Sequence, residues 1–316
     1  ARELAGRDGL DPDAVEALLG PLAQAGLVVE VGPDGTDPEQ TSPDLDAWEF
    51  HDLLFHARSR RGRTAAPFGA TYRMADRRDA PPALKPPPVG PSIPLARPDP
   101  GRTDRDEPLF STVLERRRSI RDYGDRPIDV RQLGEFLFRV ARVREIRAIE
   151  AETPRGPLRM DVALRPFPAG GALHELEFYA AVHVCDGLDP GLYYYDPAAH
   201  RLIRVRDRSP DVDRLLREAA SSAGVDPARI QVLLVLASRL PRLAWKYASI
   251  AYALTLKHVG VAYQTMYLVA TALGLAPCAL GAGDSDVFAR AAGVEYEVET
   301  SVGEFLLGSL PRSEPA

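Results

Sequence analysis

Residues 230–238, Ile-Gln-Val-Leu-Leu-Val-Leu-Ala-Ser, form a nearly continuous apolar run of strand length. A run of this kind is typical of a strand that is buried on both faces. The segment 176–184 has the same character, and residues 192–195 and 202–205 flank the turn residues 196–199, which predicts a β-hairpin. The chain is therefore expected to contain a buried sheet.

Helical patterns lie between these strands. Residues 109–118 and 130–140 are predicted helices, and the second has Leu133, Phe136, Leu137 and Val140 on one face. Residues 245–273 are expected to form one or two core helices, with Gly260 as the candidate break. A last strand is expected at 301–308. The fold class predicted for this part of the chain is α+β.

The N-terminal part has a different organisation. Asp11-Pro12 predicts the start of a short helix, and Gly26 is its expected end. Residues 27–31 are an expected strand, followed by a turn at 32–35. Helix, turn, strand and turn together predict a partial winged helix.

Nine prolines occur within residues 80–100. Because proline lacks an N–H donor and fixes φ, we expect an extended linker there. The expected division is a partial winged helix at 1–44, which is a candidate peptide-binding segment, a helical segment at 45–79, a proline-rich linker at 80–104 and the main domain at 105–316.

Composition excludes several classes of protein. The 316 residues are 45% hydrophobic and 27% charged, which argues against general disorder. A formal net charge of −6 argues against nucleic acid as the main partner. Two cysteines are too few for a disulfide framework or a four-thiolate zinc site. Since polar residues interrupt the apolar stretch 248–277 and no signal-peptide pattern opens the chain, we expect a soluble, cytoplasmic protein without a membrane partner.

The common phosphate-loop, dinucleotide, zinc-protease and hydrolase motifs do not occur, and four weaker signals remain. Residues 116–123 (RRRSIRDY) offer guanidinium groups and a hydroxyl that suit a phosphate. Residues 165–173 (RPFPAGGAL) would let the backbone approach a flat ligand. Trp245-Lys246-Tyr247 is a candidate acid/base pair. Residues 280–284 (LGAGD) form a glycine loop at a strand end.

Each of the first three signals also has an ordinary structural explanation, which is favoured when the segment is taken alone, and the fourth is weak as a lone motif. A basic helix end, a turn and a lysine at a helix start account for 116–123, 165–173 and Lys246 in turn. His51 and His56 do not have the spacing of metal ligands, so no metal site is predicted.

The order of the segments is more specific than any one of them. Residues 47–52, 55–60, 117–123, 165–173, 190–196, 246–247 and 260–275 together resemble the SagB-type dehydrogenases. These are thiazole/oxazole-forming oxidases of the nitroreductase superfamily. The resemblance covers roughly residues 45–310.

The resemblance implies an FMN-binding nitroreductase-like fold whose sites are completed in a homodimer. It also implies FMN-dependent oxidation of peptide thiazolines and oxazolines to thiazoles and oxazoles, in the biosynthesis of ribosomally made antibiotic-type peptides. The modified precursor peptide and a cyclodehydratase are the implied partners.

Residue by residue, Lys246 and Tyr247 match the pair regarded as catalytic in azole-forming members. The implied FMN contacts are Arg117, Arg118, Ser119, Arg121, Pro168, Ala169, Gly170, Gly171, Gln264, Leu280, Gly281 and Arg312. Two positions depart from the family: Ala169 stands where serine is usual, and Glu175 stands where proline is common. The first puts one polar contact to the flavin in doubt, and the second has no consequence that the sequence shows.

Three functions remain open from the sequence. The first is azoline oxidation, with Lys246 as the base or as the group that polarises the ring, Tyr247 as a proton relay and O₂ as the electron acceptor. The second is a generic NAD(P)H-dependent nitro or quinone reductase. The third is a flavin-free scaffold subunit that binds a leader peptide.

Overall fold

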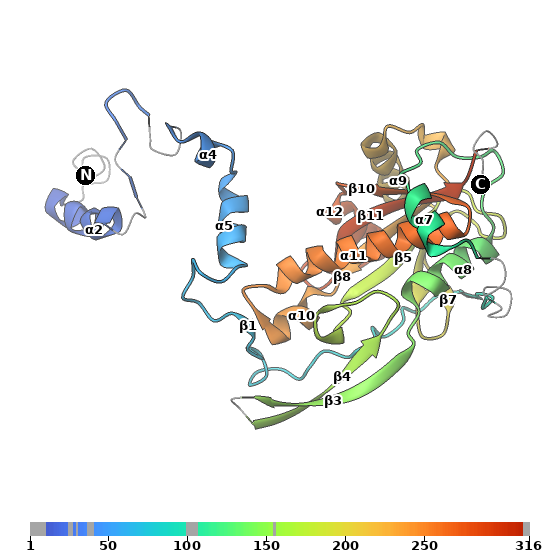
Figure 1. The fold of residues 1–316 in the computed structure, drawn as a ribbon, viewed down its shortest axis with the longest axis horizontal. Helices are drawn as coiled ribbons and strands as arrows, with labels where there is room; N and C mark the ends of the chain where they lie inside the picture. Colours follow the sequence, from blue (N-terminus) through green and yellow to red (C-terminus); the bar gives the residue numbers. More distant parts are fainter. Residues whose placement is uncertain are drawn as a thin grey trace. The chain divides into compact units, whose positions relative to one another are not determined.

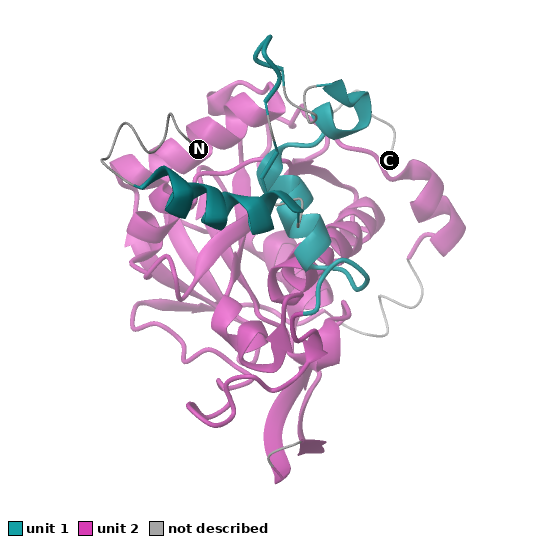
Figure 2. Cartoon of the chain, turned by 90° about the vertical axis from the view of Figure 1, so that its left-hand side faces the viewer, with its two compact units in different colours: residues 1–65 teal, residues 66–316 magenta. Residues whose placement is uncertain are grey.

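The computed structural model describes residues 11–24, 28–29, 31–36, 41–98, 107–153 and 156–311. The chain divides into two compact units, residues 1–65 and residues 66–316 (Figure 2). The boundary between residues 65 and 66 lies before the linker expected at 80–104, so residues 66–98 belong to the larger unit.

The described part of the smaller unit is helical. It contains α2 (Pro12–Gln24), α4 (Pro43–Asp46) and α5 (Phe50–Arg58).

The turn at 32–35 is present, since the Gly35 N–H donates to the Gly32 carbonyl at 2.9 Å. Val28, Val29 and Val31 are exposed and form no strand, because no described segment pairs with them. Gly26, Leu27 and Glu30 lie outside the described residues. Within the helical segment expected at 45–79, α4 and α5 are separate helices.

The larger unit is built on a seven-stranded sheet in which every neighbouring pair is antiparallel. The strand order is β10-β11-β8-β5-β6-β7-β2. The strands predicted within this unit are all present: β5 (Leu176–Val182), β6 (Gly191–Asp196), β7 (Arg201–Asp207), β8 (Val232–Ser238) and β11 (Thr300–Ser309). Strands β2 (Ser92–Pro94) and β10 (Leu275–Leu280) complete the sheet.

Helices cover both faces of this sheet. On one face lie α8 (Val130–Ala141) and α11 (Ala251–Ala272), and on the other lie α9 (Pro210–Ala223) and α12 (Ser285–Ala292). The central strand β8 shows why: Leu234 belongs to the first hydrophobic cluster and Leu233 to the second. Alternate side chains of a strand point to opposite faces, so an apolar run needs cover on both sides.

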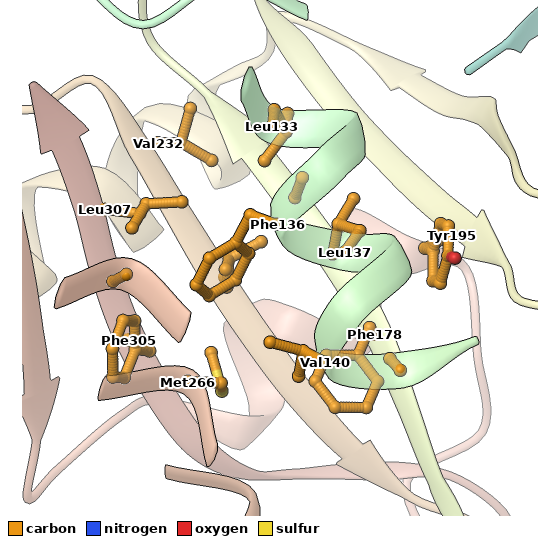
Figure 3. Close-up of a cluster of buried hydrophobic side chains, with 14 of the residues drawn as sticks. Leu133, Phe136, Leu137, Val140, Phe178, Tyr195, Val232, Met266, Phe305 and Leu307 are labelled. Carbon is orange, nitrogen blue, oxygen red and sulfur yellow. The ribbon is translucent and has the colours of Figure 1, made fainter. Parts of the chain in front are cut away.

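The first of these layers contains the predicted face of α8. Leu133, Phe136, Leu137 and Val140 are fully buried against sheet residues and Met266 of α11 (Figure 3). Asp129 and Gln132 form a capping box that starts the helix. Helix α7 (Phe110–Arg116) lies beside α11 (Figure 1).

A third hydrophobic cluster lies outside the main sheet. It joins the hairpin of β3 (Glu145–Thr153) and β4 (Gly156–Leu164) to α10 (Leu240–Lys246). The short strands β1 (Gly69–Ala70) and β9 (Tyr247–Ala248) pair beside it, and the single-turn helices η1 (Gly170–Ala172) and η2 (Pro227–Arg229) complete the unit. Leu173 and Trp245 are buried in this cluster, which therefore supports the glycine loop and the helix that carries Lys246.

The proline-rich segment is packed rather than free. Its carbonyls accept hydrogen bonds from buried arginines: Arg239 donates to Pro82 and Ala83, and Arg242 donates to Pro81. Residues 92–94 pair with β7 at the edge of the sheet. Proline forbids a central strand but leaves a carbonyl that side chains can reach. Side chains therefore hold residues 81–83, and only residues 92–94 join the sheet, as its edge strand.

Helix α11 is continuous through Gly260, so the candidate break at this glycine does not occur. An exposed glycine lowers helix stability by only about 1 kcal/mol, which packing of the buried face offsets. Trp245 and Lys246 belong to α10, and Tyr247 belongs to β9.

Candidate functional site

The glycine loop meets the lysine–tyrosine pair. Gly171 has φ +60°, and a methyl group added to it would lie 2.9 Å from Lys246 Nζ and 2.9 Å from Tyr247 Oη. Only glycine combines this backbone conformation with such a close approach. The two candidate catalytic side chains therefore end directly against the loop that the sequence singled out.

Lys246 lies in an aromatic setting. The residue is 7% exposed, and its Nζ lies 5.3 Å from the ring centre of Tyr72 and 5.4 Å from that of Tyr247. Among the described residues, no carboxylate forms an ion pair with it. Ring faces stabilise an ammonium group without neutralising it, which leaves the amine available to a ligand.

Tyr72 is a site residue that the sequence did not indicate. It reaches Lys246 because its backbone N–H donates to the Lys246 carbonyl at 2.9 Å, next to the β1–β9 pairing. Burial, followed by the neighbouring Tyr72, raises the pKa of Tyr247. The Tyr247 hydroxyl therefore stays protonated at neutral pH and can donate a proton or a hydrogen bond.

The basic segment lies beside β10. The Ile120 N–H donates to the Pro277 carbonyl at 2.8 Å, and the Ser119 hydroxyl is 2.6 Å from the hydroxyl of Tyr267 on α11. The Arg117 guanidinium lies over the Tyr267 ring at 5.2 Å. Tyr267 thus orders the segment while leaving its cationic groups at the surface.

These groups fit a bound phosphate. Arg117 is half-buried, whereas Arg118 and Arg121 are exposed. Neither Arg117 nor Arg121 has a carboxylate partner within the described ranges. Guanidinium groups beside a hydroxyl, with no internal counter-charge, are the donor set that a phosphate monoester requires.

Leu280 and Gly281 line a pocket of about 400 Å³ at the end of β10. A side chain at Gly281 would meet nothing, so its backbone faces open space. Tyr263 of α11 lines the same pocket, and its hydroxyl donates to the Leu280 carbonyl at 3.4 Å. The backbone at 280–281 is thus available to a planar ligand.

Helix α11 carries contacts to both groups of candidate residues. His258 contacts Gly170, whereas Tyr267 contacts Ser119, nine residues further along. At 1.5 Å per residue the two contacts are about 13 Å apart along the axis. The structure therefore brings Lys246, Tyr247 and Gly171 together, and separately brings together Arg117, Ser119 and the β10 edge.

The remaining predicted contacts are placed as follows. Pro168 is exposed and Ala169 half-buried at the start of the glycine loop, where the Ala169 carbonyl accepts the Ala172 N–H at 3.0 Å. Gln264 is exposed on α11. Arg312 lies outside the described residues.

Glu304 is a further ionisable group in the pocket beside Leu280. It is 8% exposed, and a side chain at Gly283 would occupy the place of its carboxylate. Burial raises the pKa of Glu304 from 4.5 to about 6. The carboxyl is thus easier to protonate in the folded protein than in the unfolded chain.

We predict that Glu304→Gln stabilises the folded protein at pH 7.5 but not at pH 4.5. Because the folded-state pKa is the higher one, the charged carboxylate costs stability as the pH rises from 4.5 through about 6. At pH 7.5 the variant should gain about 2 kcal/mol in unfolding free energy, and at pH 4.5 it should gain almost nothing. Urea unfolding at the two pH values measures this. An equal gain at both would show that the charge is not the cause.

One cluster of possible metal ligands appears among the described residues. Glu49, His51 and Asp52 lie within reach of one another on α5 and the residue before it, and all three are exposed. Exposed acidic groups often gather without an ion, so no metal site is assigned there. No described helix is long and apolar enough to cross a membrane.

Parts of this chain match models of known protein families. A model of the nitroreductase family matches residues 114–309, and a model of the cyanobactin oxidase ThcOx matches residues 9–65. A nitroreductase-like protein of Methanocaldococcus jannaschii is 28% identical over 179 residues, which cover 57% of this chain and 81% of the relative.

Solved structures show the same fold. A nitroreductase-like structure from Ralstonia eutropha has a TM-score of 0.51 at 21% identity and covers 71% of this chain and 92% of that one. One from Anabaena variabilis has a TM-score of 0.54 at 19% identity, covering 81% of this chain and 45% of that one. A chain of the Escherichia coli microcin synthetase McbBCD complex, with truncated pro-MccB17 bound, has a TM-score of 0.51 at 17% identity and covers 82% and 91%. Since the family model covers residues 114–309 of 316, this chain belongs to the nitroreductase family.

Proposed function

We propose that this protein is an FMN-dependent azoline oxidase that converts thiazolines or oxazolines in a modified precursor peptide to thiazoles or oxazoles. The observation that carries the proposal is the meeting of Lys246 Nζ and Tyr247 Oη at Gly171. The match of residues 9–65 to the cyanobactin oxidase model supports a peptide substrate over a free nitro compound.

The residues present fit FMN in two places. Arg117, Ser119 and Arg121 would hold its phosphate, and the backbone at Gly170–Gly171 and Leu280–Gly281 would border its ring. When bound, FMN would supply the two-electron hydride acceptor that azoline oxidation requires.

Aromatisation of an azoline also releases a proton from the adjacent ring carbon. Lys246, whose amine has no carboxylate partner among the described residues, takes this proton as a base or polarises the ring while it leaves. Tyr247, protonated at neutral pH, passes a proton between the amine and solvent. Loop 170–171 excludes water from one side of both groups. We expect O₂ to be the final electron acceptor.

The same hypothesis includes a homodimer. Two neighbouring helices leave large apolar side chains exposed: Leu109, Phe110 and Leu114 on and next to α7, and Tyr252, Leu256 and Val261 on α11. Patches of this kind commonly bury themselves against a second copy. A partner copy would also explain why the phosphate contacts and the glycine loop lie apart in one chain. A cyclodehydratase is the proposed source of the azoline.

The first test is the visible spectrum of the purified full chain. We expect oxidised-flavin bands and release of FMN on denaturation. A synthetic thiazoline peptide should then lose the mass of two hydrogens per ring in air. Rapid reduction of the flavin by NADPH without azoline turnover would favour a generic nitro or quinone reductase instead. A colourless protein that takes up no FMN would contradict the proposal and favour a leader-binding scaffold.

A further inference from the structure

A buried hydrogen-bond chain ends on the glycine loop. The Gly170 backbone N–H donates to Nε2 of His258 at 2.7 Å, and Nδ1 of the same ring lies 2.8 Å and 3.0 Å from the two carboxylate oxygens of Glu175. Glu175 has no exposed surface and His258 is 5% exposed. Water therefore does not compete for these bonds.

The directions of the bonds determine the state of the ring. Nε2 accepts the Gly170 N–H, so it carries no proton. Nδ1 must then carry the ring proton and donate it to Glu175, whose carboxylate can only accept. His258 is thus a neutral ring with one defined tautomer, and Glu175 is the group that selects it.

His258 joins the two ends of one loop. Gly170 begins the loop and Glu175 ends it, and His258 projects from α11 to both. Between them, Gly171, Ala172 and His174 have φ of +60°, +55° and +38°. Left-handed backbone is unfavourable for residues with a side chain, so the loop holds this shape only while something outside it fixes its ends.

Two arginines lie next to the pair. Arg242 donates to the Leu173 carbonyl within the loop, and the Arg239 N–H donates to the Glu175 carbonyl at 3.0 Å. On α11, Leu254 contacts the Gly170 position. No other described side chain donates to the Glu175 carboxylate in place of His258.

We propose that Glu175 and His258 are positioning residues that hold the Gly170–Gly171 loop against Lys246 and Tyr247, and thereby against the flavin ring. The proposal rests on the proposed function. It gives a role to Glu175, the position where this chain departs from the proline common in the SagB-type dehydrogenases.

Three variants of the full chain test it. His258→Phe removes the acceptor for Gly170. His258→Gln places an amide oxygen near the former position of Nε2 and can accept the same N–H. Glu175→Leu removes the group that selects the tautomer. His200→Phe is the matched control, because His200 is also buried and also makes two hydrogen bonds, to Tyr195 Oη at 3.0 Å and the Ala96 carbonyl at 3.1 Å.

The first readout needs no substrate. In protein labelled with ¹⁵N-histidine and ¹⁵N-glycine, we expect His258 to show the Nδ1–H tautomer and the Gly170 amide to exchange slowly with solvent. Exchange should become at least about tenfold faster in His258→Phe, as the amide loses its acceptor. It should stay slow in His258→Gln and in His200→Phe.

The second readout is turnover of the FMN-loaded enzyme on the thiazoline peptide. His258→Phe and Glu175→Leu should lower kcat about 10- to 100-fold, the usual effect of a misplaced catalytic group, with FMN content and KM little changed. His258→Gln should recover much of this loss. In the His258→Gln background, Glu175→Leu should cost little, since no tautomer remains to select.

Each result has a clear meaning. Unchanged Gly170 exchange and kcat in His258→Phe would overturn the proposal, as would an equal fall of kcat in His200→Phe. If the wild-type protein bound no FMN or oxidised no azoline, the proposed function would fail, and the tautomer and exchange data would still decide whether this chain holds the loop.

Discussion

Lys246→Ala is expected to lower azoline oxidation by about 10²–10⁴-fold while leaving FMN bound, because a positioned acid/base group contributes about that much to a proton transfer. The side chain is enclosed by the rings of Tyr72 and Tyr247, and solvent has little access to replace it. The measurement is steady-state turnover on a thiazoline peptide, with FMN content determined from the flavin spectrum of the same preparation.

Lys246→Arg separates the two roles open to the amine. Arginine keeps the positive charge and the contact with the rings but does not lose its proton at neutral pH. If Lys246 is the base, this variant should be as slow as Lys246→Ala, and added small amines should partly restore the alanine variant. If the residue only polarises the ring, arginine should retain substantial activity. Full oxidation by Lys246→Ala with normal FMN content would show that the assignment is wrong.

His174 is expected to make the protein unstable in mild acid. It is 3% exposed, its Nδ1 has no hydrogen-bond partner and its ring lies edge-on to Phe167 at 5.1 Å. Burial, followed by the positive charges of Arg165 and Arg242, lowers the pKa of His174 from 6.5 to about 3. The folded protein therefore resists a proton that the unfolded chain accepts.

The sign follows from this difference. The contribution of neutral His174 to the unfolding free energy is fully present above pH 6.5. It is lost as the pH falls from 6.5 towards 3, because only the unfolded state binds the proton in that range. Between pH 7.5 and 4.5 the unfolding free energy should fall by about 3 kcal/mol from this residue alone. Urea unfolding at the two pH values measures the fall.

His174→Asn should remove most of that dependence, since asparagine does not titrate and tolerates the positive φ at this position. His51→Asn, at an exposed histidine of the smaller unit, is the control and should leave the dependence unchanged. An unchanged slope in His174→Asn would mean that acid sensitivity arises elsewhere.

Local patterns in the sequence were sufficient for the central elements. The apolar run at 230–238 predicted β8, and the spacing of Leu133, Phe136, Leu137 and Val140 predicted α8. These predictions succeeded because burial on one or both faces determines which residues an element can carry. The glycine loop and Lys246-Tyr247 were also visible, as each is a contiguous stretch with unusual chemistry.

Other features depended on residues that are distant in the chain. Tyr72 reaches Lys246 only through the β1–β9 pairing, and the prolines at 81–82 are held by Arg239 and Arg242. Helix α11 continues through Gly260, the candidate break, because tertiary packing outweighs a propensity difference of about 1 kcal/mol.

The sequence by itself determined the fold class, the family resemblance and the residues with candidate catalytic chemistry, since these depend on composition and order along the chain. Only the tertiary structure decided which of them meet. It placed Lys246 and Tyr247 at Gly171, separated them from Ser119 along α11, and linked Glu175 through His258 to Gly170. The physical reason is that a contact between residues 75 or more positions apart depends on the path of the intervening backbone, which no local pattern specifies.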